Sequence, residues 1–307
     1  MISFFPSARS LGAVFLTLTF LSLGAGAAAQ TENSLVATDA DPFPVGSGVV
    51  TVDFNGTPLN LHYYKPGSYS GEQFIVVFHG ASRTAARYRN SSVLMAERSH
   101  SLVVVPEFDA ERFPNRTYQF GGVFREDGSV ASPEEWTYSY VPLIVEYIRE
   151  REGDPEMTHF FLGFSAGGQF TGRMAAMQDS EAERIVVTSS GSCMFPTREM
   201  RFGLGFGGLP EHLSSDERIR RFLAQPITVY VGTADTELAQ LPTGDAYDQG
   251  VHRYSRNIRW FNEAMDLAYE NDWEFNWRLV IADGPGHTPK DVFDHPQTEN
   301  ALFGHRR

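Results

Sequence analysis

Residues 159–177 read HFFLGFSAGGQFTGRMAAM, which predicts a buried strand, a sharp turn that carries one serine, and a helix. The apolar run 160–162 suits a strand buried on both faces, and apolar residues in 170–177 recur at helical spacing. Between them lies a G-x-S-x-G pentapeptide, residues 163–167. In this setting the pattern predicts a nucleophile elbow, whose glycines let strand and helix approach closely. Ser165 is therefore the candidate nucleophile; the alternative is a glycine-rich turn without chemistry.

Composition limits the classes of protein to consider. The 307 residues are 42% hydrophobic and 13% aromatic, enough for one large domain or two small ones. A net charge of −13 argues against a nucleic-acid backbone as partner, because such a partner requires a basic face. Cys193 is the single cysteine, which excludes an internal disulfide and a cysteine-based zinc site. The nine histidines show no H-x-x-x-H or similar ligand spacing, so we expect no metal.

The first 29 residues have the pattern of a signal peptide. Arg9 supplies the positive charge, residues 11–23 form an apolar run, and three alanines at 27–29 suit a cleavage site. An uncleaved membrane anchor is the alternative, but the run is short and is interrupted by threonine, serine and glycine. We therefore expect export to the periplasm or the medium, with no stable membrane span after cleavage.

The rest of the chain predicts one domain behind a short tether. Residues 30–48 are polar and are expected to form the tether, whereas 49–307 alternate short apolar strands with helices. This alternation indicates an α/β fold, a mostly parallel sheet of about eight strands flanked by helices. An Asn-Gly pair at 55–56 predicts a hairpin between the first two strands. The expected strands are 49–54, 59–64, 74–78, 102–105, 160–162, 185–188, 227–231 and 277–281, and the main expected helices are 85–100, 134–151, 169–177, 215–223, 253–269 and one from 289.

A serine hydroxyl needs a base, usually a histidine, before it can act as a nucleophile. Ligands and catalytic groups of such sheets gather beyond the carboxyl ends of the strands. His287 lies just beyond the last predicted strand, in the glycine- and proline-rich loop 283–289, and is the candidate base. His79 also ends a strand, but it precedes a glycine where an oxyanion loop is expected. The other histidines are interpreted as solvated or structural.

The histidine in turn needs a carboxylate, which the chain order Ser, Asp, His places between nucleophile and base. Asp235 fits, because it lies in the loop at the carboxyl end of strand 227–231, 70 residues after Ser165 and 52 before His287. Four rivals lie farther into that loop or too close in sequence to the histidine; they are Glu237, Asp245, Asp248 and Asp283.

Acyl transfer also requires two backbone donors for the oxyanion. The N–H of Ala166, the residue after the candidate nucleophile, is the first expected donor. The second is expected from the loop 79–82, where Ala81 is preferred and Ser82 is the second choice. An ordinary strand-to-helix turn is the alternative interpretation of this loop.

Six segments together give the chain a family resemblance. They are HGASRTAARYR at 79–89, VVPEFD at 104–109, GFSAGGQF at 163–170, GTADTE at 232–237, DQGVHRYSRN at 248–257 and GPGH at 284–287. In this order they resemble the α/β-hydrolase superfamily, within it the exported esterases similar to polyhydroxybutyrate depolymerases and feruloyl esterases. The resemblance implies a Ser-Asp-His triad of Ser165, Asp235 and His287 that forms an acyl-enzyme without a cofactor.

The resemblance also bears on the substrate. Secreted depolymerases of solid polyester typically carry a linker and a binding domain, and the sequence has room for neither, so a small or oligomeric ester is expected. Aromatic residues in the long loops 108–136 and 191–210 are expected to line an acyl or aryl pocket. Two alternatives stay open. One is an amidase or peptidase with the same triad, and the other is a non-catalytic binding protein on a hydrolase scaffold.

Overall fold

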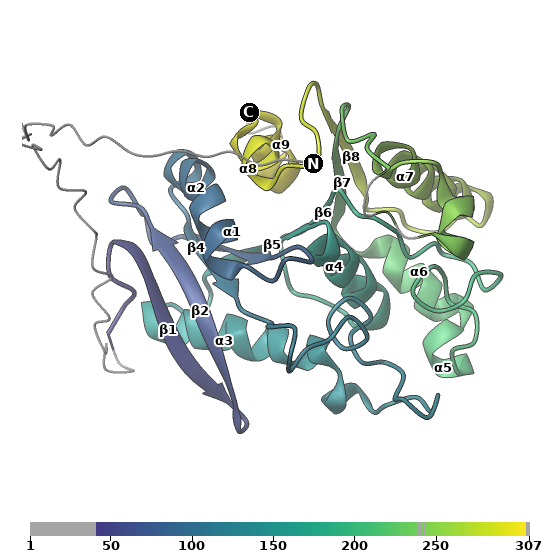
Figure 1. The fold of residues 1–307 in the computed structure, drawn as a ribbon, viewed down its shortest axis with the longest axis horizontal. Coiled ribbons are helices and arrows are strands. Elements are labelled where there is room, and N and C mark those ends of the chain that lie inside the picture. Colours follow the sequence, from purple (N-terminus) through teal and green to yellow (C-terminus); the bar gives the residue numbers. More distant parts are fainter. Residues whose placement is uncertain (1–40, 239–240, 242, 305–307) are drawn as a thin grey trace, which may run out of the picture. The chain divides into compact units, whose positions relative to one another are not determined.

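The computed structural model describes residues 41–238, 241 and 243–304 (Figure 1). The predicted signal peptide and residues 30–40 of the predicted tether lie outside this part of the chain. No helix in the described part is long and apolar enough to cross a membrane.

The described residues form an eight-stranded sheet in the order β1-β2-β4-β3-β5-β6-β7-β8 (Figure 1). β2 runs antiparallel to β1 and to β4, and the pairs from β4 to β8 are parallel. The predicted α/β fold with a mostly parallel sheet is therefore confirmed. The strands are β1 (Gly46–Phe54), β2 (Thr57–Lys65), β3 (Gln73–Phe78), β4 (Leu102–Pro106), β5 (Thr158–Phe164), β6 (Arg184–Thr188), β7 (Ile227–Gly232) and β8 (Arg278–Ala282).

Helices cover both faces of the sheet (Figure 1). Successive side chains of a strand point to opposite faces, so the apolar residues of a central strand pack in two separate clusters. Phe74, Val76 and Phe78 of β3 pack in one apolar cluster with residues of α3, α4, α6 and α7. Ile75 and Val77 pack in the other with residues of α1, α2, α8 and α9. The α-helices are α1 (Ala85–Ser91), α2 (Val93–Ser99), α3 (Tyr140–Glu152), α4 (Ala166–Met177), α5 (Glu211–Ser214), α6 (Asp216–Ala224), α7 (Arg253–Glu270), α8 (Pro289–Asp294) and α9 (Gln297–Phe303).

The antiparallel hairpin starts earlier than the sequence pattern predicts. Its turn residues, Asn55 and Gly56, both have positive φ, 56° and 86°, as the predicted two-residue turn requires. However, β1 begins at Gly46, three residues before the expected start at 49. Phe43 is 2% exposed and its ring centroid lies 4.8 Å from that of Tyr63. The end of the predicted tether is therefore part of the packed domain.

Two predicted helices have different limits. The helix expected over 85–100 is divided at Ser92 into α1 and α2, and the Ser92 hydroxyl donates to the Tyr88 carbonyl at 2.9 Å. The helix expected from 134 begins only at Tyr140, after the short 3₁₀ turns Pro133–Glu135 and Thr137–Ser139. Pro142 explains the later start, because a proline lacks the N–H that a helix interior needs and is tolerated in a first turn.

Candidate active site

The elbow between β5 and α4 holds Ser165 in a strained backbone conformation, with φ 57° and ψ −113°. A non-glycine residue rarely adopts positive φ, and such strain is concentrated at functional sites. The turn also brings backbone into close contact. A Cβ on Gly163 would lie 2.2 Å from the Gly167 carbonyl oxygen, and one on Gly167 would lie 1.9 Å from that of Phe78. Both glycines are therefore required by the approach of helix to strands.

Three side chains from the ends of three strands meet at this elbow. The Ser165 Oγ lies 3.0 Å from Nε2 of His287, and His287 Nδ1 lies 3.2 Å from Oδ2 of Asp235. An ionised carboxylate can only accept, so Nδ1 carries the hydrogen and Nε2 is left to accept from the serine hydroxyl. The structure thus brings together the three residues predicted to act as nucleophile, acid and base.

Asp235 is fully buried, and a buried arginine lies beside it. Arg253 of α7, 3% exposed, places Nη1 3.8 Å from Asp235 Oδ1, on the oxygen that does not face the histidine. The Tyr254 N–H also donates to the Asp235 carbonyl at 3.1 Å, which ties the start of α7 to this loop. A buried carboxylate is normally paired with a positive charge, and Arg253 is the positive charge next to Asp235. Arg253 belongs to a segment quoted for the family resemblance, but the sequence does not indicate its contact with the acid.

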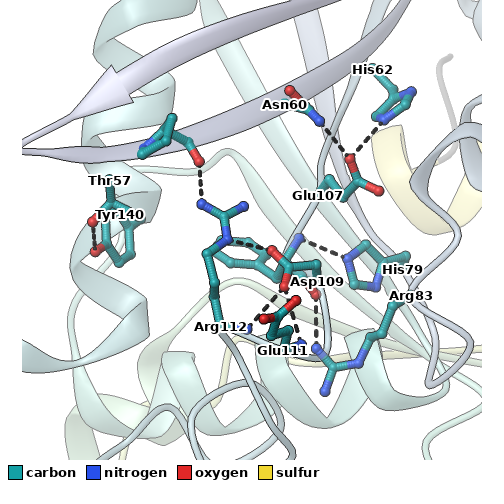
Figure 2. A network of polar contacts seen from close by, with 12 residues as sticks. Thr57, Asn60, His62, His79, Arg83, Glu107, Asp109, Glu111, Arg112 and Tyr140 are labelled. Atoms are coloured by element: carbon teal, nitrogen blue, oxygen red, sulfur yellow. Dashed lines mark hydrogen bonds and ion pairs between the residues drawn. The ribbon is translucent and has the colours of Figure 1, made fainter.

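His79 lies at the same edge of the sheet but has a structural environment. It is fully buried and stacks on Tyr118, with ring centroids 4.9 Å apart. Its Nε2 accepts from the Phe108 N–H at 3.1 Å (Figure 2), and its Nδ1 lies 3.2 Å from the Gly80 carbonyl oxygen. Burial lowers the pKa of His79 to about 4, so the ring is neutral near pH 7.

The loop after β3 lies against the elbow, as an oxyanion loop must. A Cβ built on Gly80 would lie 3.5 Å from the Cβ of Ser165. The Arg83 N–H closes a turn on the Gly80 carbonyl at 3.1 Å, and this turn does not use the N–H groups of Ala81 and Ser82. The Arg83 side chain donates to the Phe108 carbonyl at 2.9 Å, which fixes the loop to the one after β4 (Figure 2).

The first predicted donor, Ala166, is the first residue of α4. Its N–H has no helical carbonyl to bind, because the first N–H groups of a helix have no partner within the helix. The assignment of Ala166 with Ala81, or with Ser82, to an oxyanion hole stays a prediction.

A cavity of about 490 Å³ lies between the loops that follow β4, β6 and β7, and it reaches the elbow helix α4 at Gln169, one turn after Ser165. Some aromatic residues of the two long loops line this cavity, and others are buried in the core. Phe120 and Phe202 line the cavity, whereas Trp136 is 2% exposed in the core and donates its indole N–H to the Ala131 carbonyl. Asp245, a rival for the triad acid, also lines the cavity, and Asp283 accepts from the Thr233 hydroxyl at 3.2 Å.

A second cavity, of about 820 Å³, lies beside α3 and the start of β5, and it does not include the elbow. Its lining includes His159, whose pKa burial lowers to about 4. Within the described part of the chain, no group of three or more histidine, cysteine, aspartate or glutamate residues could hold a metal ion.

No family model and no curated protein matches the chain. The solved structures that are similar to it over most of its length include the following two. The poly(3-hydroxybutyrate) depolymerase LpqC from Bordetella parapertussis is 29% identical, with a TM-score of 0.76 over 84% of this chain and 92% of that one. Poly(aspartic acid) hydrolase-1 from Sphingomonas sp. KT-1 is 28% identical, with a TM-score of 0.75 over 81% of this chain and 96% of that one. The likeness therefore concerns the domain as a whole.

Proposed function

The chain belongs to the α/β-hydrolase superfamily, as the sequence predicts, and we propose that it is a serine esterase acting through Ser165, Asp235 and His287. The single observation that carries the proposal is the chain of contacts from Ser165 Oγ to Nε2 and from Nδ1 to Asp235, at 3.0 and 3.2 Å. These distances suit the transfer of a proton between serine and histidine. A non-catalytic binding protein on this scaffold would be expected to lack the nucleophile or the base, and this chain has both.

In the proposed acylation step, Ser165 Oγ attacks the ester carbonyl while His287 Nε2 takes the hydroxyl proton. The buried Asp235 holds the imidazole with its free nitrogen toward the serine and stabilises the imidazolium that forms. Negative charge develops on the carbonyl oxygen, and the N–H groups of Ala166 and Ala81 are the proposed donors that stabilise it. The imidazolium then protonates the departing alkoxide, which leaves an acyl group on the serine.

Deacylation reverses the roles with water in place of the alcohol. His287 takes a proton from water, the resulting hydroxide attacks the acyl-enzyme carbonyl, and the serine oxygen leaves with the proton returned by the histidine.

Hydrolysis of short and medium p-nitrophenyl acyl esters by the mature protein, beside Ser165→Ala, tests this proposal. We expect turnover by the wild type and loss of turnover in the variant. Absence of turnover by a folded wild type would contradict the esterase proposal. Turnover that persists in the variant would mean that another residue is the nucleophile.

Amide hydrolysis by the same triad is the second candidate. It is favoured by the similarity to a poly(aspartic acid) hydrolase, since a polymer of aspartic acid is joined by amide bonds. Similarity to a poly(3-hydroxybutyrate) depolymerase favours an ester, and we propose a small or oligomeric ester as the substrate. Ester and amide substrates of matched acyl group distinguish the two candidates by their relative kcat/KM. Export of the mature protein stays a prediction.

A further inference from the structure

The cavity beside the elbow contains an arginine without a counterion. Arg201 lines this cavity and is exposed to solvent. In the part of the chain that the structure describes, its guanidinium makes no hydrogen bond and no ion pair, although acidic residues outnumber basic ones 38 to 25. Among the other exposed arginines of the described residues, some pair with carboxylates, as Arg198 and Arg221 do, and others, such as Arg220, are unpaired but lie outside this cavity. An unpaired arginine inside a cavity of an acidic protein points to a ligand that supplies the negative charge.

A second arginine lies beneath the same cavity. Arg173 of α4 is 1% exposed and donates to the carbonyls of Gly203 and Gln119, at 2.9 and 2.7 Å, and to Ser192 Oγ at 2.9 Å. All three acceptors are neutral, and among the described residues no carboxylate lies within 4 Å of this guanidinium. Buried charges are normally paired, so Arg173 leaves excess positive charge in a region of low dielectric.

The Arg173 guanidinium lies close to the cavity, because two of the residues that accept its hydrogen bonds, Gln119 and Ser192, line the cavity. Burial lowers the pKa of Arg173 to about 10, and the group is still protonated near pH 7. Asp245, on the lining, offsets one positive charge, so the two arginines together leave the cavity with an excess of one positive charge. Apolar contact is available from Phe120, Phe202 and Leu204.

The cavity lies within reach of a substrate held at the elbow. Gln169 of α4 lines it and donates its side-chain N–H to Ser192 Oγ at 2.8 Å. The Gln169 backbone N–H donates to the Ser165 carbonyl at 3.0 Å, so the two residues are one helical turn apart. Four residues of helix span about 6 Å, the length of a chain of about four to five bonds.

We propose that this cavity binds a carboxylate of the substrate and that Arg201 is a specificity-determining residue that pairs with it. The substrate class is then an ester with a free carboxylate a few bonds from the scissile carbonyl. The planar guanidinium can bind a carboxylate through two parallel hydrogen bonds, which the ammonium of lysine cannot reproduce. The inference rests on the proposed esterase function and adds the charge of its substrate.

Matched pairs of esters test the inference. Monoethyl esters of succinic, glutaric and adipic acid place the carboxylate on the acyl side, and 3-acetoxybutyrate places it on the alcohol side. Each is compared with the primary amide of the same shape, which is neutral, by the ratio of the two kcat/KM values in a pH-stat. We expect the wild type to prefer the carboxylate by about tenfold in at least one pair.

Variants of Arg201 then test whether this residue causes the preference for the carboxylate. Arg201→Ala should reduce the carboxylate-to-amide ratio to about one, and Arg201→Lys should recover only part of it. Arg220→Ala removes the same charge from an exposed arginine of α6 outside the cavity, and it should retain the wild-type ratio. Raising the salt concentration should lower the ratio in the wild type and not in Arg201→Ala, because salt screens an exposed ion pair.

The outcomes separate this inference from the function on which it rests. Hydrolysis of the amide-bearing esters without any carboxylate preference would overturn the carboxylate site and leave the esterase function in place. A carboxylate preference that persists in Arg201→Ala, with the protein still folded by circular dichroism, would also overturn the role of Arg201. No turnover on any ester by the folded wild type would overturn the proposed function and this inference with it.

Discussion

The loops after β3 and β8 each carry a histidine at the same edge of the sheet, and the surroundings of the two rings differ. His79 after β3 is enclosed, and both of its nitrogens have backbone partners, the Phe108 N–H and the Gly80 carbonyl. His287 after β8 has a side chain that is 17% exposed, with a carboxylate on one nitrogen and a serine hydroxyl on the other.

The difference shows that proximity to the elbow does not make a histidine a base. A general base needs a nitrogen whose lone pair faces a transferable proton. In His79 that lone pair already accepts from a backbone amide, so protonating it would break a buried hydrogen bond. In His287 the lone pair faces Ser165, and the carboxylate behind the ring stabilises the protonated form.

The largest expected effect comes from replacing the two histidines in turn. His287→Ala should lower kcat for a p-nitrophenyl ester by about 10⁴-fold or more, because the serine loses its base. His79→Gln should lower kcat by less than about tenfold, through small shifts of the neighbouring oxyanion loop. Steady-state kinetics on both purified variants measures the contrast, and comparable losses in the two would erase the distinction between the loops.

The next effect concerns the carboxylate behind His287. Asp235→Asn keeps the shape of the side chain but can donate to Nδ1, which favours the tautomer with its hydrogen toward the serine. We expect kcat to fall by about 10³- to 10⁴-fold, as for the corresponding change in serine proteases. Asp283→Asn is the matched control, since Asp283 contacts Thr233 rather than the triad. A large loss in the control and a small one in Asp235→Asn would reassign the acid.

The structural role of His79 predicts a pH dependence of stability. Its pKa is about 4 in the folded protein and about 6.5 when unfolded, so between these values the unfolded state binds more protons. The free energy of unfolding is therefore highest above pH 6.5, where the ring is neutral in both states, and it decreases as the pH falls toward 4. The decrease amounts to about 3 kcal/mol over that range.

His79→Gln should therefore be less stable than the wild type near pH 7, and the difference should narrow as the pH falls, because the variant lacks this titration. Urea unfolding at about pH 7, 6 and 5 measures the free energy of unfolding of both proteins. A difference that stays constant with pH would show that His79 is not kept neutral by burial.

The smallest expected effect on catalysis comes from replacing two aromatic residues of the loop 108–136, one in the cavity and one in the core. Phe120→Ala should change the preference for acyl chain length by about fivefold, because Phe120 lines the cavity. Trp136→Ala should instead lower stability by about 3–5 kcal/mol and leave that preference as in the wild type, because Trp136 is buried. Kinetics on an ester series and thermal unfolding of both variants give the comparison; an unchanged preference in Phe120→Ala would remove it from the acyl site.

The sequence predicts most of the fold and the proximity of three side chains because the relevant signals are local. A G-x-S-x-G turn between an apolar strand and a helix defines the position of Ser165, and Asp235 and His287 each follow a strand end. Parallel strands deliver their carboxyl ends to one edge, so chain order and strand position are sufficient to bring these residues together.

Other features depend on contacts that no local pattern records. The contact of Arg253 with Asp235 and the position of Arg173 beneath the cavity arise from the packing of irregular loops against α4 and α7. Phe43 has its partners in β2 and α3, far along the chain, so the local sequence pattern places it in the tether. The late start of α3 does have a local signal, because Pro142 suits the first turn of a helix.

The most direct test of the central claim is to locate the acyl group. The mature protein is mixed with a p-nitrophenyl ester, quenched in acid within the first turnovers, digested and examined by peptide mass spectrometry. We expect an added acyl mass on the peptide that contains Ser165, and its absence from the same peptide of Ser165→Ala. An acyl group carried by a different residue, or an acylated peptide that persists in Ser165→Ala, would contradict the account.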